Sequence, residues 1–103
     1  MSDRYAGKPF LRLLDSYVLN AIGELDEANA EWLKVSEPNF AHQYGGSGTW
    51  QQIVEQRMQF RPGMRAAIVE SWESGRAKFR KGTGEEPHPV KFAHMFVDRH
   101  FPS

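Results

Sequence analysis

The chain has 103 residues and a mass of 11.8 kDa, which is the size of one ordinary domain. Hydrophobic residues make up 40% and charged residues 25%, a composition that excludes disordered, collagen-like and membrane proteins and is typical of a soluble globular domain. The 13 basic and 13 acidic side chains balance, so no overall field attracts nucleic acid or an anionic membrane. The absence of cysteine excludes disulfides, thiolate metal sites and cysteine nucleophiles.

No stretch of the sequence has the features of a signal peptide, a membrane span or a lipid anchor. Residues 1–7 are expected to form a flexible N-terminus, and the most apolar stretch, from Phe10 to Leu25, is interrupted by charged residues. We therefore expect a cytoplasmic protein with no membrane association, folded as a single helical domain over residues 1–103.

Apolar residues spaced three and four apart predict a first helix from Pro9 to Leu25. Proline is favoured at the first helical position, where its missing N–H has no role. Polar residues of this segment, among them Arg12, Asp15 and Ser16, fall largely on the opposite side of the helix. Leu11 and Leu19 lie off the apolar stripe, so we expect this helix to contact neighbours across a wide face and to sit centrally.

Asp26 is suited to cap a second helix that carries Ala28, Trp32 and Val35 inward. A short turn of helix follows Pro38 over residues 39–44 and is closed by Gly45. We expect the three tryptophans of the chain to pack in the core; they are Trp32, Trp50 and Trp72.

Thr49 and Gln52 form a capping-box pattern ahead of a helix that Phe60-Arg61-Pro62-Gly63 interrupts. The helix that follows Pro62 ends either near Ser74 or near Lys81, because Gly75 is compatible with both. Residues 82–88 are predicted to be an exposed loop, and a last helix begins at Pro89. The fold class is therefore all-α, a compact bundle of about five helices with short loops.

One Gly-rich stretch precedes a predicted helix and is a candidate anion site. Its residues are Gly46, Ser47, Gly48 and Thr49. Free N–H groups and the positive helix end favour a phosphate at such a place. The stretch lacks the lysine of a phosphate-binding P-loop and no strand precedes it, so an ordinary connector is the favoured interpretation.

A basic cluster surrounds Phe79, although the chain as a whole is neutral. Its members, together with two arginines near Pro62, are the candidate nucleic-acid contacts: Arg61, Arg65, Arg76, Lys78, Arg80 and Lys81. Cations also stabilise the C-terminal end of a helix, and Phe79 continues the apolar stripe of the helix that follows Pro62, which is the simpler explanation of the cluster. Nucleic acid is therefore the less favoured partner.

No spacing of residues predicts catalysis, a cofactor or a metal site. Of the four histidines, only His94 has a carboxylate four residues away, at Asp98, and two ligands make a poor site. The sequence has no GxSxG or HExxH pattern, and its glutamates fall on the expected wet sides of helices. We expect a protein that is not an enzyme.

Several helix-packing patterns resemble a family of small uncharacterised bacterial proteins of about this length. They are Pro9-Phe10-Leu11-Arg12-Leu13-Leu14, Tyr17-Val18-Leu19, Ala21-Ile22-Gly23, residues 50–53 and Phe92-Ala93-His94-Met95-Phe96-Val97-Asp98. The resemblance implies a bacterial cytoplasmic protein with no assigned activity, and it transfers no functional residue. The leading hypothesis is a protein-interaction module (an adaptor, a regulator or an immunity-type protein), with a homodimer among its expected forms.

Overall fold

The computed structural model describes residues 4–101, and the regular structure within that range is entirely helical, as predicted. Six helices form rather than about five, because residues 37–44 make a full helix of their own. In chain order they are α1 (Pro9–Ala21), α2 (Glu27–Val35), α3 (Glu37–Tyr44), α4 (Trp50–Met58), α5 (Met64–Thr83) and α6 (Pro89–His100).

Helix α1 begins at Pro9 as predicted but ends at Ala21, four residues before the expected Leu25. Gly23 adopts a left-handed conformation with φ of 74°. Its N–H and the N–H of the next residue donate to carbonyls in the last turn of α1, at 3.1 and 2.9 Å. This pair of bonds is the Schellman motif, which ends a helix even where the apolar spacing continues.

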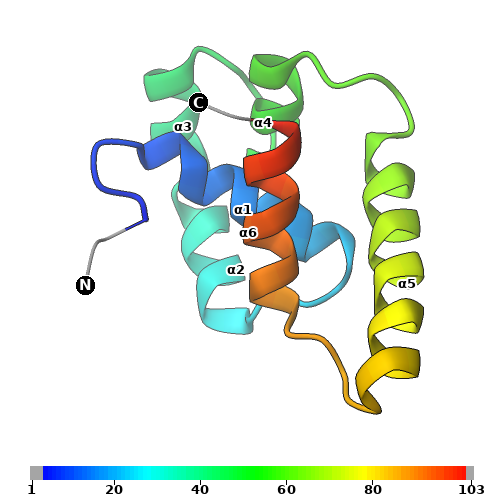
Figure 1. Cartoon of the computed structure of the whole chain (residues 1–103). Helices are drawn as coiled ribbons and strands as arrows, with labels where there is room; N and C mark the ends of the chain where they lie inside the picture. Colours follow the sequence, from blue (N-terminus) through cyan, green and yellow to red (C-terminus); the bar gives the residue numbers. More distant parts are fainter. Residues whose placement is uncertain (1–3, 102–103) are drawn as a thin grey trace.

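The middle of α1 is buried on all sides. Residues 13–18 are all buried, which includes Asp15 and Ser16 with exposed fractions of 1% and 7%. The spacing placed these two residues opposite the apolar stripe, yet they are buried because α4, α5 and α6 pack around α1, which has the central position that was expected (Figure 1).

A single apolar core forms around α1, with α6 lying across it in Figure 1. Every helix contributes to this core. Its buried members are Leu13, Leu14, Tyr17, Val18, Leu33, Phe40, Trp50, Ile53, Val54, Ile68, Ala93, Phe96 and Val97.

Helix α2 directs a different face to the core from the one predicted. Its buried residue is Leu33, whereas Ala28, Trp32 and Val35 are exposed. Trp32 keeps 39% of its surface exposed and Val35 keeps 65%. Leu33 fills the core position beside Phe40, so the stripe expected to point inward lies on the outside of the molecule.

The turn between α3 and α4 follows the prediction. Gly45 closes α3 in the left-handed conformation, and Thr49 forms the capping box of α4. The Thr49 hydroxyl accepts from the Gln52 N–H at 3.1 Å, and the Gln52 side chain accepts from the Thr49 N–H at 2.9 Å. Trp50 is buried at the start of α4, as expected.

Helix α5 takes the longer of its two predicted forms and continues two residues past Lys81 to Thr83. Gly75 is an interior helical residue, and Gly82 and Thr83 belong to the helix, so the loop expected over 82–88 is shortened to 84–88. Only Ile68 and Trp72 are buried along its 20 residues. The second half of α5 thus extends beyond the core, as Figure 1 shows.

Ile68 should be the side chain that holds α5 to the core, because its exposed fraction is 0%. We predict that Ile68→Ala lowers the free energy of unfolding by about 2–4 kcal/mol, since the substitution leaves a cavity in a packed core. The control is Val69→Ala at the neighbouring, half-buried position, for which a loss below about 1 kcal/mol is expected. Urea denaturation followed by circular dichroism measures both; equal losses would contradict this packing.

Candidate functional site

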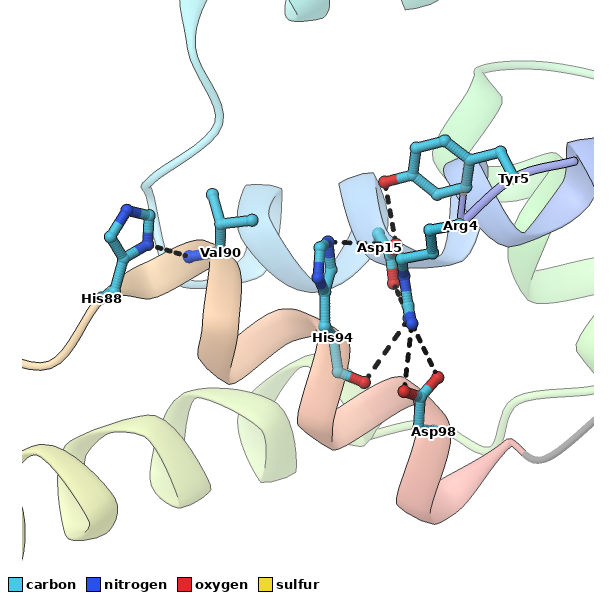
Figure 2. A network of polar contacts seen from close by, with 7 residues as sticks. All are labelled: Arg4, Tyr5, Asp15, His88, Val90, His94 and Asp98. Carbon is cyan, nitrogen blue, oxygen red and sulfur yellow. Dashed lines mark hydrogen bonds and ion pairs between the residues drawn. The ribbon is translucent and has the colours of Figure 1, made fainter. Parts of the chain in front are cut away.

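The most connected polar cluster links the N-terminal segment, α1 and α6 (Figure 2). The Arg4 guanidinium binds both Asp15 carboxylate oxygens, at 2.7 and 2.9 Å, and lies 3.0 Å from the Asp98 carboxylate. The Tyr5 hydroxyl also donates to Asp15, at 2.9 Å, and His94 Nε2 lies 3.6 Å from the same carboxylate. The buried Asp15 is thus surrounded by donors.

This cluster has the chemistry of a structural clamp. Burial, reinforced by the Asp15 charge, raises the pKa of Tyr5 to about 12, so its hydroxyl keeps the proton that it donates. The hydrogen bond from Arg4 lowers the pKa of Asp98 and keeps this exposed carboxylate ionised. Of the N-terminal segment that was expected to be flexible, Arg4 and Tyr5 are therefore tied to α1, and residues 1–3 lie outside the described residues.

His94 and Asp98 on α6 both belong to the cluster around Arg4 and Asp15, but they face different partners within it. His94 faces Asp15, while Asp98 binds Arg4. His88 has a different role, since its Nδ1 accepts from the Val90 N–H at 3.2 Å and caps α6. Within residues 4–101, no three His, Asp or Glu side chains are grouped as a metal ion requires.

The amides of the Gly-rich loop are engaged by side chains. The Ser47 N–H donates to Gln56 at 3.3 Å, and the Thr49 N–H donates to Gln52. The Trp50 N–H donates to the Glu37 carboxylate at 3.0 Å. Because a carboxylate already lies at the positive end of α4, a second anion at Gly46, Ser47, Gly48 and Thr49 would be repelled.

The structure does not bring the six candidate nucleic-acid residues together. Arg61 and Arg65 lie at the start of α5, where the Arg65 guanidinium is 5.5 Å from the Tyr17 ring centroid. The cluster at 76–81 lies near the other end of a helix about 30 Å long. Both Arg76 and Arg80 bind one carboxylate on the following loop, which leaves the exposed Lys78 and Lys81 as the unneutralised part of the cluster.

A groove of about 420 Å³ lies between the second half of α5 and the first half of α6. Side chains from both helices and from the loop 84–88 line it. They are Trp72, Gly75, Arg76, Phe79, Glu86, Pro87, His88, Lys91, Phe92 and Met95. Its size is within the range of ligand and peptide sites.

The floor of this groove, which we call the α5–α6 groove, is aromatic. The rings of Trp72 and Phe92 lie 5.0 Å apart at a tilt of 59°, and Phe92 continues to Phe96 of the core at 5.8 Å. The walls carry Phe79 with 42% and Met95 with 58% of their surface exposed. Large apolar side chains therefore face solvent above a rigid floor.

The rim of the groove is charged and mainly basic. The Glu86 carboxylate accepts from Arg76 Nε at 2.8 Å and lies 3.2 Å from Arg80 Nε. The hydrogen bond from Arg76 lowers the pKa of Glu86, so the carboxylate stays ionised at neutral pH. One carboxylate faces two guanidiniums, and Lys91 adds a further cation, so the rim is net positive.

Sequence analysis missed the groove although it named several of its residues. Phe79 was expected to continue the core stripe of α5, but the helix extends past the core and leaves this ring exposed. Trp72 is buried as predicted, against α6 rather than within the main core. The sequence feature that pointed to this site was the group of cations around a single aromatic residue at 76–81.

Comparison with known proteins identifies no relative. No family model matches the chain, and neither the curated proteins nor the solved structures give a significant match. Over the part of the chain that the structure describes, no helix is both long and apolar enough to cross a membrane. The resemblance to a bacterial family stays a prediction.

Two substitutions test the clamp. We predict that Asp15→Asn lowers the free energy of unfolding by about 2–4 kcal/mol, because the buried amide has one acceptor oxygen instead of two and turns an NH2 group toward the Arg4 guanidinium. Asp98→Asn should lower the free energy of unfolding by less than about 1 kcal/mol. The Asp98 side chain is 60% exposed, so water replaces its ion pair with Arg4. Chemical denaturation at pH 7 measures both losses, and equal values would contradict the clamp.

The pH dependence of Asp98→Asn has a defined sign. The pKa of Asp98 is lower in the folded protein than in the unfolded chain, so its stabilising effect is present above the ordinary aspartate pKa. That effect is lost as the pH falls through the folded value. The stability difference between wild type and Asp98→Asn should therefore begin to shrink near about pH 4 and disappear only below the folded pKa of Asp98.

Proposed function

We propose that this protein is a non-enzymatic protein-interaction module whose docking site is the α5–α6 groove. The observation that carries this proposal is the exposure of Phe79 and Met95 on the walls of a groove with an aromatic floor. Exposed aromatic and methionine side chains over a rigid pocket are the residues that concentrate binding energy in protein interfaces.

The shape of the site favours a helix or an extended peptide over a small molecule. The groove is open along two helices that approach each other at one end, and its apolar residues recur along α5 and α6 at helical spacing. An amphipathic helix laid into such a groove buries its apolar face and leaves its polar face in water. The charged rim then selects the partner, and its positive excess favours an acidic one.

The polar groups of the groove are poorly suited to proton transfer. Glu86 is held ionised by two guanidiniums, whereas a general acid needs a raised pKa. His88 is occupied as the cap of α6. These contacts support a binding role for the site, in an adaptor, a regulator or an immunity-type protein of the bacterial cytoplasm.

Capture from a lysate of source cells tests the proposal when two matched variants are compared. We predict that immobilised wild-type protein retains a partner protein, that Phe79→Glu retains at least about tenfold less, and that Ala77→Glu retains the wild-type amount. Both substitutions add one negative charge to an exposed residue of α5, but Ala77 does not line the groove.

Nuclease treatment and two salt concentrations separate the proposal from the nucleic-acid alternative. Retention that survives nuclease and high salt supports protein docking. Material that is lost with nuclease and falls steeply with salt would instead assign the cations at 76–81 to nucleic acid. Equal retention by wild type and Phe79→Glu would contradict the groove as the docking site.

A further inference from the structure

Helix α2 carries an apolar stripe that the fold covers only in part. Ala28, Trp32 and Val35 are spaced by four and three residues, and all three are exposed. Residues at this spacing are the anchors by which an amphipathic helix binds a groove. The Arg12 guanidinium lies 4.1 Å from the Trp32 ring centroid and Phe40 packs against its edge at 5.7 Å, which fixes the orientation of the indole.

The α2 stripe lies in the most acidic part of the chain. Residues 24–37 contain five acidic side chains and one basic side chain. Glu27 and Glu31, both exposed, flank the apolar residues on α2 itself. The stripe is therefore an apolar surface with an acidic border.

The α5–α6 groove has the complementary character. The charged side chains that line it are Arg76, Lys91 and Glu86, and Arg80 lies 3.2 Å from the Glu86 carboxylate, so three cations surround one carboxylate. Of the five large hydrophobic residues exposed within the described range, two lie on the α2 stripe and two line this groove. Apolar surface and opposite charge thus match between the two sites.

We propose that the α2 stripe of one copy docks into the α5–α6 groove of a second copy, in a head-to-tail contact. Figure 1 shows α2 and α5 on different sides of α6, so one molecule cannot make this contact with itself. The inference rests on the proposed function of the groove as a helix-docking site, and it names a second copy of this chain as an occupant.

Head-to-tail docking predicts a form of assembly that differs from a symmetric dimer. Each copy uses one stripe and one groove, and a free stripe and a free groove remain at the two ends. Assembly therefore continues beyond the dimer, either to a closed ring or to an open chain. A single helix buries little area, so the contact should be weak and concentration-dependent.

Two interface variants and two matched controls test this arrangement, each adding one negative charge at an exposed position. Val35→Glu blocks the stripe, because a carboxylate must be desolvated within an apolar contact. Met95→Glu blocks the groove by facing the acidic border of the stripe. The controls are Gln43→Glu on α3 and Ala77→Glu on α5, which lie outside both surfaces.

Sedimentation velocity over a range of concentrations measures the result. We expect wild type and both controls to assemble beyond the dimer, and Val35→Glu and Met95→Glu each to associate at least about tenfold more weakly. An equimolar mixture of the two blocked variants should form a 1:1 dimer and stop there. The intact stripe of one variant meets the intact groove of the other, and the two blocked surfaces that remain, each with its added carboxylate, repel each other.

Other outcomes overturn the inference and show where it fails. Loss of assembly in Met95→Glu with normal assembly in Val35→Glu would keep the groove as a docking site but exclude the α2 stripe as its occupant. A wild type that stays monomeric, or a mixture that does not complement, would overturn head-to-tail docking. The capture experiment with Phe79→Glu decides separately whether the groove binds another protein.

Discussion

All-round burial of the middle of α1 is the constraint on which the rest of the structure depends. A helix that is covered on every side has no position for an unpaired polar group, so Asp15 must be provided with donors within the protein. Arg4 and Tyr5 supply them, and Arg4 also reaches Asp98 on α6. One buried carboxylate thereby fixes the N-terminal segment against two helices.

Packing around α1 also explains why a groove forms elsewhere. Helices α4, α6 and the first half of α5 cover α1, and the loop 84–88 must then return the chain from the far end of α5 to the start of α6. Past Trp72, α5 has no buried residue, and Trp72 itself packs against Phe92 of α6. The two helices share the contact between Trp72 and Phe92 and leave Phe79 and Met95 exposed to solvent.

Much of this fold could be predicted from local signals. Pro9, Gly45 and the Thr49 capping box act through backbone and side-chain hydrogen bonds within a few residues, and each has the predicted role. The errors arise where tertiary packing determines which residues of a helix are buried. Helical spacing placed Asp15 opposite the apolar stripe, but a period of 3.6 residues cannot indicate which polar residues become buried when several helices surround one.

The error at α2 has a different cause, and it bears on function. The spacing of Ala28, Trp32 and Val35 indicates that this face of the helix is suited to burial, but it does not say whether the same chain or another molecule buries it. The core receives Leu33 from α2 instead, and the stripe stays outside. A stripe with core-like spacing that the fold leaves open, together with a groove of matching apolar and opposite charged character, is more simply explained by an intermolecular contact than by two unrelated exposed surfaces.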